Sequence, residues 1–207
     1  MSGENHILLK SSCRERFAPA VKLIEELACD KSRESILIAI DGKCASGKST
    51  LGFYLQEIFD ANLFHMDDFF LQKHQRTTER LAEVGGNVDY ERFKEEVLNP
   101  LKTGKQIEYR KFDCSKLEIT KSTIIEPKCI NIIEGSYSLH PYFGEPYDLR
   151  IFTEIDYDNQ LENIRKRNGE ERLLQFIERW IPKEEAYFEK FGIKETCDVV
   201  IEWIKKD

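Results

Sequence analysis

Residues 36–50 read ILIAIDGKCASGKST, and this stretch decides the fold of the chain. The apolar run at residues 36–40 predicts a short strand that is buried on both faces and ends at Asp41. Residues 42–49 then match the pattern G-x-x-x-x-G-K-[ST] in full, and helical spacing of apolar residues follows from Thr50 to Phe59. Because this pattern binds phosphates where it joins a strand to a helix, we predict a phosphate-binding loop here.

The loop has the residue types that phosphate binding requires. Its glycines let successive backbone N–H groups turn inward, and a helix that begins near Lys48 directs its positive end at the same point. We expect Lys48 to reach the β- and γ-phosphates of ATP, and the hydroxyl of Ser49 to ligate Mg²⁺. The residues expected to bind ATP are Gly42, Lys43, Cys44, Ala45, Ser46, Gly47, Lys48, Ser49 and Thr50.

Strand and helix patterns alternate along the rest of the chain. Apolar runs at residues 62–66, 130–133, 149–153 and 199–203 predict further strands. Residues 17–28, 92–98, 160–167 and 173–188 have helical spacing, with a break or kink expected at Pro182, and residues 102–127 suggest a small β excursion. Repeated strand-then-helix order predicts an α/β fold of the P-loop NTPase type, a mostly parallel sheet with helices on both faces.

Length and composition predict one domain, residues 1–207, with a small lid near residues 160–180. A net charge of −7 gives no basic field for nucleic acid, so we expect a small diffusible substrate instead. The six cysteines lack any C-x-x-C pair, and no apolar stretch is long enough to span a membrane. These features favour free thiols and a cytoplasmic location, and no pattern indicates an oligomeric state.

Carboxylates follow two of the expected strands. Glu134 ends the strand at residues 130–133, where P-loop enzymes place an acid near the metal ion and its waters. Asp67 and Asp68 follow the strand at residues 62–66, where they would face the γ-phosphate. Neighbouring side chains point in different directions, so we expect only one of the two to serve as the base for an acceptor hydroxyl. His65 fits a structural role better than that of a metal ligand.

These residues resemble the motifs of the uridine kinase and phosphoribulokinase branch of P-loop kinases. Four ordered segments carry the likeness after the loop: residues 67–70 (DDFF), 87–93 (NVDYERF), 134–135 (EG) and 163–168 (NIRKRN). The resemblance implies that Asp67 is the catalytic aspartate and that Asp89 binds hydroxyls of the acceptor. It also implies that Arg167, on the lid helix, closes over the phosphates. The expected activity is ATP-dependent phosphorylation of a small-molecule hydroxyl with Mg²⁺.

The acceptor is less well defined, because the chain departs from the family pattern. Phe70 and residues 112–116 (FDCSK) stand where pyrimidine-selective members have a tyrosine and a Y-D-x-x-x-H-like segment, so the histidine is missing. Phe70, Tyr109 and Phe112 are expected to stack on a base, which favours the 5′-hydroxyl of a ribonucleoside with weak base selectivity. Asp67, Asp89 and Glu134 complete the expected substrate site.

Three alternatives remain beside the nucleoside kinase. The acceptor could be a hydroxylated metabolite that is not a nucleoside. A GTPase or ATPase switch would use the same loop without an acceptor, but the chain has no N-K-x-D and no D-x-x-G motif. A nucleotide-binding module without activity is the third alternative, against which the intact Lys48, Ser49 and Asp67 argue.

Overall fold

Five parallel strands form the central sheet, in the order β2-β5-β1-β6-β7. A computed structural model describes residues 3–203, so both ends of the expected domain 1–207 lie outside the described part. The strands are β1 (Ile36–Gly42), β2 (Asn62–His65), β5 (Ile130–Glu134), β6 (Leu149–Glu154) and β7 (Val199–Glu202). The parallel α/β sheet predicted from the sequence is therefore confirmed.

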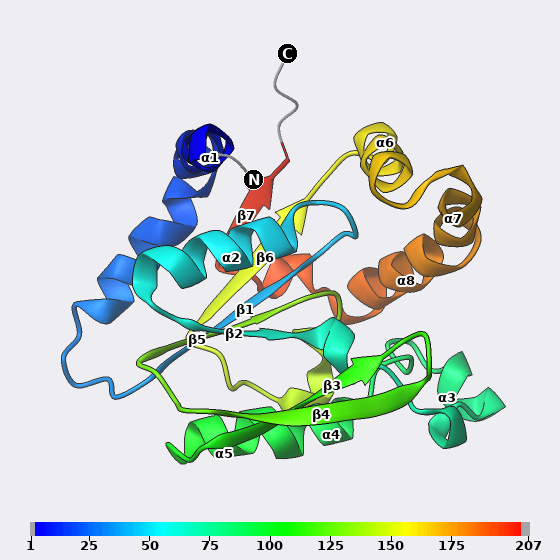
Figure 1. Cartoon of the computed structure of the whole chain (residues 1–207), viewed down its shortest axis with the longest axis horizontal. Coiled ribbons are helices and arrows are strands. Elements are labelled where there is room, and N and C mark those ends of the chain that lie inside the picture. The colour runs from blue at the N-terminus through cyan, green and yellow to red at the C-terminus, as the bar shows by residue number, and fades with distance from the viewer. Residues whose placement is uncertain (1–2, 204–207) are drawn as a thin grey trace.

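Helices cover both faces of the sheet (Figure 1). On one face lie α1 (Gly3–Ala28) and α2 (Lys48–Phe59), and on the other lies a helical run of α4 (Tyr90–Phe93), η3 (Lys94–Leu98) and α5 (Asn99–Lys102). Strand β1 is buried on both sides, because Ile36, Ile38 and Ile40 pack toward α1 and α2 while Leu37 joins the opposite core. This is the arrangement that a continuous apolar strand predicts.

A two-stranded antiparallel hairpin, β3 (Ile107–Asp113) and β4 (Glu118–Ile125), confirms the β excursion expected within residues 102–127. It packs on η3 and on η1 (Met66–Phe69), a short 3₁₀ turn. This turn also explains why β2 ends at His65, one residue before the predicted end. Three shorter 3₁₀ turns and one short helix complete the connections: η2 (Lys73–Gln75), α3 (Thr78–Ala82), η4 (Pro141–Phe143) and η6 (Lys194–Thr196).

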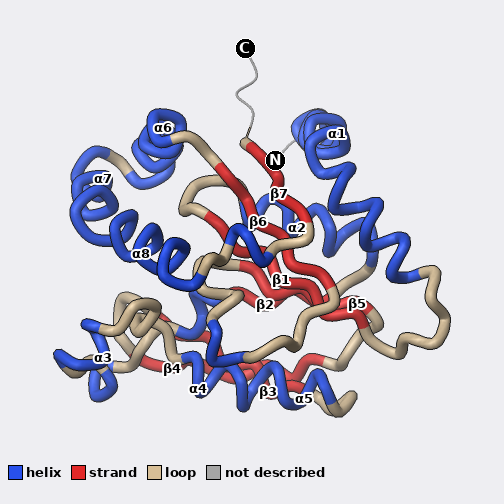
Figure 2. The backbone as a smooth tube through the Cα atoms, turned by 180° about the vertical axis from the view of Figure 1, so that it is seen from behind, coloured by secondary structure: helices blue, strands red, loops and turns tan. Residues whose placement is uncertain are grey.

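Residues 160–180, where the lid is expected, belong to a group of helices beside the sheet, visible from both sides in Figures 1 and 2. It consists of α6 (Tyr157–Asn168), α7 (Glu170–Gln175), η5 (Phe176–Trp180) and α8 (Ile181–Phe191). The expected break at Pro182 is wrong in form: Pro182 lies in the first turn of α8, and helical backbone continues through it. A wide π-turn, η5, directly precedes it and accommodates the missing N–H.

Within residues 3–203, no helix combines the length and the apolar character that a membrane span needs.

Candidate active site

A cavity of about 1090 Å³ opens at the carboxyl ends of β1, β2 and β5. The loop after β1, the turn η1 after β2 and the residues after β5 line it from the sheet. The hairpin tip and the lid helices line it from the sides. Ligands of α/β folds bind at this edge of the sheet, and every strand-end motif singled out in the sequence reaches it.

The phosphate-binding loop connects β1 to α2 through a backbone that requires glycine. Gly42 has φ 133°, and a Cβ there would lie 2.2 Å from the carbonyl oxygen of Thr153. Gly47 has φ 98° and directly precedes α2. The ammonium of Lys48 lies inside the loop and donates to the carbonyl oxygens of Gly42 and Lys43, at 2.6 and 2.8 Å. A phosphate entering the loop would therefore meet this cation and the positive end of α2.

Side chains from distant elements hold the outer side of the loop. Gln160 of α6 donates to the carbonyl oxygen of Cys44 at 3.1 Å, and Asn163 donates to that of Ala45 at 3.2 Å. Arg16 of α1 donates to the carbonyl oxygen of Ser46 at 2.7 Å. The sequence motif gave no sign of these contacts, because their donors lie 30 to 118 residues from the loop.

Glu184 of α8 is a further contact that the sequence analysis missed. Its side chain is buried and lines the cavity. One carboxylate oxygen accepts a hydrogen bond from the backbone N–H of Cys44 at 2.9 Å, and the other accepts from the hydroxyl of Ser136 at 2.7 Å. Glu184 thereby joins the loop, the segment after β5 and the helix that follows the lid.

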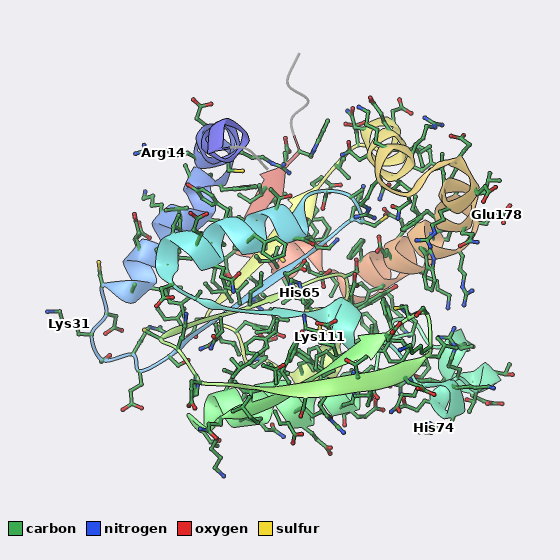
Figure 3. The ribbon with its side chains drawn as sticks, viewed as in Figure 1. Arg14, Lys31, His65, His74, Lys111 and Glu178 are labelled. Carbon is green, nitrogen blue, oxygen red and sulfur yellow. The ribbon has the colours of Figure 1, made fainter. Side chains whose placement is uncertain are left out.

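Ser49 and Glu134 lie together, as the sequence predicts for two groups on the metal side. The hydroxyl of Ser49 is 3.2 Å from both carboxylate oxygens of the buried Glu134. His65, near the centre of the molecule in Figure 3, places Nδ1 2.5 Å from one of these oxygens. Burial opposes the charged ring, but the hydrogen bond and the negative charge of Glu134 outweigh it and raise the pKa of His65. His65 therefore orients the carboxylate.

The oxygen donors in this corner fit Mg²⁺. Within residues 3–203, no group of three His, Cys, Asp or Glu side chains could hold a metal ion by itself. Mg²⁺ needs no such group, because one or two carboxylates together with nucleotide phosphates and waters hold it in many enzymes. The hydroxyl of Ser49 and the carboxylate of Glu134 supply donors of the required type.

The two adjacent aspartates after β2 have different environments. Asp68 accepts a hydrogen bond from the hydroxyl of Tyr109 at 2.6 Å, so its carboxylate is bound to the hairpin. Asp67 lines the cavity and receives no hydrogen bond from any residue of the described part. The enclosing walls and the charge of Glu134 raise the pKa of Asp67, against the attraction of Lys48. Of the two carboxylates, Asp67 is the one open to an acceptor.

The structure does not bring together all six residues that were predicted for the substrate site. Phe70 and Phe112 line the cavity. Tyr109 does not: it is buried, and its ring packs on Phe64 with centroids 5.4 Å apart. The expectation that Tyr109 stacks on a base is therefore corrected, because no face of its ring is free. Its hydroxyl instead fixes Asp68.

Asp89 is also absent from the cavity wall. It is buried and caps α4 by accepting from the backbone N–H of Arg92 at 3.1 Å, while its other oxygen accepts from Gln75 at 2.8 Å. An acceptor diol would have to replace these bonds. Asn87, two residues earlier, does line the cavity. Its buried side-chain oxygen and nitrogen form no hydrogen bond of good geometry, although the phenol of Tyr137 is near enough to interact with the amide. An unpaired buried amide at this position is a better candidate for binding an acceptor.

Arg167 lies at the end of α6 and lines the cavity, as a lid arginine should. Its Nε donates to the side chain of Asn168 at 2.8 Å, and its guanidinium is 5.9 Å from the centre of the Phe176 ring. Neither contact is an ion pair, so its charge is available to a phosphate. Arg172 of α7 and Arg179 of η5 line the same cavity.

Asp41 does not line the cavity, but its carboxylate holds the backbone of the segment after β5. It is buried and accepts hydrogen bonds from the backbone N–H groups of Gly42, Tyr137 and Leu139 and from the hydroxyl of Tyr187. Burial outweighs these bonds and raises the pKa of Asp41 to about 6. Tyr137, which lines the cavity, is held at φ 75°, a conformation that few side chains adopt without such support.

Comparisons with known proteins give similarity at the level of structure. No protein-family model matches the sequence, and a search of curated proteins finds no match. A protein from Bacillus stearothermophilus described as a possible uridine kinase has a TM-score of 0.70 and 22% identity, over 92% of this chain and 99% of that chain.

Two further solved structures are similar over almost the whole chain. A candidate fructose transport system kinase from Silicibacter sp. TM1040 has a TM-score of 0.68 and 19% identity, over 93% of this chain and 98% of that one. The YGR205w protein has a TM-score of 0.62 and 17% identity, over 94% of both chains. Together with the loop and the sheet order, these likenesses show that the chain has the fold of the P-loop kinases that resemble uridine kinase.

Proposed function

We propose that this protein is an ATP-dependent kinase that transfers the γ-phosphoryl group to a hydroxyl of a small molecule. One observation carries the proposal: the phosphate-binding loop and the unpaired carboxylate of Asp67 face the same cavity. At about 1090 Å³ the cavity is at the upper end of the range for small-molecule sites, so it has room for an acceptor beside a nucleotide. A switch protein without an acceptor would not need this second space.

The residues suggest how the transfer would proceed. The loop N–H groups and Lys48 would hold the β- and γ-phosphates, and Ser49 and Glu134 would hold Mg²⁺, which would supply positive charge where negative charge develops. Asp67 accepts the proton of the acceptor hydroxyl as its oxygen bonds to the γ-phosphorus. The bond from that phosphorus to the β,γ-bridging oxygen breaks, and ADP leaves. The raised pKa of Asp67 suits a group that takes up a proton. Arg167 stabilises the charge and excludes water from the lid side.

A ribonucleoside phosphorylated at its 5′-hydroxyl is one candidate acceptor. The likeness to a possible uridine kinase and the two rings of Phe70 and Phe112 on the cavity wall support it. The buried positions of Tyr109 and Asp89 weaken it, because both were expected to contact the nucleoside. A hydroxylated metabolite of another class needs neither contact, and the cavity accommodates it equally.

The decisive experiment compares two neighbouring substitutions, Asp67→Asn and Asp68→Asn. We expect Asp67→Asn to lower kcat by about a hundredfold or more, with ATP affinity nearly unchanged, because it removes the base and leaves the loop intact. Asp68→Asn keeps an acceptor for the hydroxyl of Tyr109, so it should stay within a few-fold of wild type. A coupled ADP-release assay over a panel of hydroxylated acceptors would measure both, and binding of a fluorescent ATP analogue would report affinity.

Two results would contradict the proposal. A severe loss in Asp68→Asn with a mild one in Asp67→Asn would exchange the roles of the two carboxylates. Fast ATP consumption that no acceptor changes would favour a switch or an ATPase, since a kinase that closes on its acceptor hydrolyses ATP slowly alone.

A further inference from the structure

The cavity wall on the acceptor side has arginines that the phosphate-binding machinery does not explain. Arg76, between η2 and α3, and Arg179, on η5, both line the cavity. Within residues 3–203, no carboxylate forms an ion pair with either side chain, and no hydrogen bond engages either guanidinium. Glu178, the neighbour of Arg179 in the chain, lies at the outer edge of the lid in Figure 3. Arg179 is exposed and lies over the ring of Trp180, with its guanidinium carbon 4.7 Å from the ring centre, so what both arginines lack among the described residues is an anionic partner.

A third cation lies beside them. Lys183 of α8 donates to the carbonyl oxygen of Leu81 at 3.2 Å, which joins α8 to the segment that contains Arg76. Burial lowers the pKa of Lys183, and the charges of Arg179 and Arg76 lower it further, so Lys183 lies within electrostatic reach of both arginines. We refer to Arg76, Arg179 and Lys183 as the basic cluster. Like charges held this close repel one another unless an anion lies between them.

The basic cluster belongs to the acceptor end of the cavity. Arg76 also acts electrostatically on Cys114, which lies at the hairpin tip, two residues after Phe112, and lines the same cavity. The cations near the loop have other partners: Lys48 donates to loop carbonyl oxygens, and Arg16 donates to the carbonyl oxygen of Ser46. The phosphates of ATP would lie at the loop, so they do not account for the cluster.

We propose that the acceptor carries an anionic group, a phosphate or a carboxylate, which Arg76 and Arg179 bind while its hydroxyl faces Asp67. The inference rests on the proposed kinase activity. Guanidinium groups present paired N–H donors that match the oxygens of both anions, and Lys183 adds charge behind them. The unpaired amide of Asn87 and the rings of Phe70 and Phe112 line the same cavity and would contact the skeleton of the acceptor. A neutral nucleoside would leave the cluster uncompensated.

Kinetics with matched acceptor pairs would test the proposal. Each pair has one skeleton with and without an anionic group: uridine and uridine 3′-phosphate, ribose and ribose 5-phosphate, glycerol and glycerate. We expect the anionic member of at least one pair to have a kcat/KM at least tenfold above its neutral partner. Arg76→Ala and Arg179→Ala should each lower that value about tenfold to a hundredfold, the usual effect of losing a charge-assisted hydrogen bond, with KM for ATP unchanged.

Lys73→Ala is the matched control, because Lys73 is exposed, is three residues from Arg76 and does not line the cavity. It should leave every constant unchanged. Circular dichroism would confirm that the variants fold. Preference for the neutral member of every pair would overturn the proposal. So would a rise in KM for ATP in Arg76→Ala or Arg179→Ala, because the arginines would then serve the nucleotide.

A binding experiment separates this proposal from the proposed kinase activity. With the loop filled by Mg²⁺ and a non-hydrolysable ATP analogue, calorimetry would follow titration with inorganic phosphate and, separately, with malonate. We expect one of the two anions to bind the wild type, and Arg76→Ala to weaken it at least tenfold while Lys73→Ala does not. Anion binding with no phosphorylated acceptor would support the site and contradict the kinase. Absence of binding by both anions would overturn the site.

Discussion

Replacing Glu184 by alanine should weaken ATP binding, although Glu184 belongs to no motif in the sequence. The buried carboxylate accepts from the N–H of Cys44 at 2.9 Å and from the hydroxyl of Ser136 at 2.7 Å. It thus holds a backbone amide of the phosphate-binding loop from a helix 140 residues further along the chain. Without it, the N–H of Cys44 loses its hydrogen bond to α8, and the backbone of the loop gains freedom.

The expected magnitude follows from the two bonds. A hydrogen bond to a charged group contributes about 1.5–3 kcal/mol, and a buried N–H left unpaired costs about 1–3 kcal/mol. Removing the buried charge offsets part of this loss. A net cost of about 2–4 kcal/mol remains, of which one part lowers the stability of the whole fold and the other part lowers the stability of the loop conformation that binds ATP. If half of this free-energy cost falls on the loop conformation, KM for ATP rises about fivefold to thirtyfold, since 1.4 kcal/mol corresponds to a factor of ten.

Two control variants make the experiment specific. Glu184→Gln keeps an oxygen for the N–H of Cys44 and an amide that can donate to Ser136, so it should stay within a few-fold of wild type. Glu185→Ala removes the adjacent carboxylate, which is half exposed and 3.7 Å from Lys43, and should cost about 0.5 kcal/mol or less. Fluorescent-nucleotide titration and urea unfolding would measure both quantities. If Glu184→Ala matches wild type in ATP affinity and in unfolding midpoint, the role assigned to Glu184 is refuted.

Two further predictions concern the loop and the buried aspartate. Lys48→Ala should abolish phosphoryl transfer, because no other cation occupies the loop interior in the described structure; turnover within a few-fold of wild type would contradict the assignment. The pKa of Asp41 is raised from 3.8 to about 6, so its contribution to folding stability is fully present below about pH 4 and is lost as the pH rises through 6. Urea unfolding between pH 4 and 7 should show that wild type loses about 3 kcal/mol relative to Asp41→Asn; a difference that does not change with pH would disprove this.

The parts of the fold and site that the sequence predicted are those whose determinants are contiguous. Residues 36–59 contain a strand, a loop and a helix, and each is specified by its own residues. Ser49 and Glu134 could both be expected on the metal side, because the loop that leads to Ser49 follows β1 and Glu134 ends the neighbouring parallel strand β5, and the carboxyl ends of both strands share an edge. The small β excursion within residues 102–127 was predicted from the β-branched residues of the segment itself, and the structure shows it as the hairpin of β3 and β4.

Other parts depend on contacts that no local pattern contains. The choice between Asp67 and Asp68 is made by the hydroxyl of Tyr109, which lies 41 residues from Asp68. The same contact explains why Tyr109 was misplaced: an aromatic side chain near a site can face the ligand or support its wall, and only packing decides. Asp89 was expected in the cavity from its motif, but capping of α4 and the bond from Gln75 hold it away from the cavity.

Different segments of the chain form the nucleotide end and the acceptor end of the cavity. This difference limits what similarity of fold indicates about the acceptor. The nucleotide end is built from the motif and from Glu134, which the fold positions in the same way whatever the acceptor is. The acceptor end is built from Arg76, Asn87, the hairpin tip and Arg179, all of them in segments outside the parallel sheet. Such segments can change while the sheet and loop remain, so similarity of fold supports a kinase more strongly than it supports any one acceptor.

One helical run nevertheless connects the two ends. Arg179 and Glu184 are five residues apart on the continuous backbone of η5 and α8. Arg179 belongs to the basic cluster, whereas Glu184 accepts a hydrogen bond from the loop N–H of Cys44. Their roles differ nevertheless, because Arg179 is an exposed cation of the cavity wall, whereas Glu184 is a buried carboxylate that accepts from a loop N–H. Glu184 acts on the loop through its own hydrogen bond, which is why a substitution there should affect ATP although it lies outside the motif. Arg179 has no such bond to the loop in the described structure, so its substitution should leave KM for ATP unchanged.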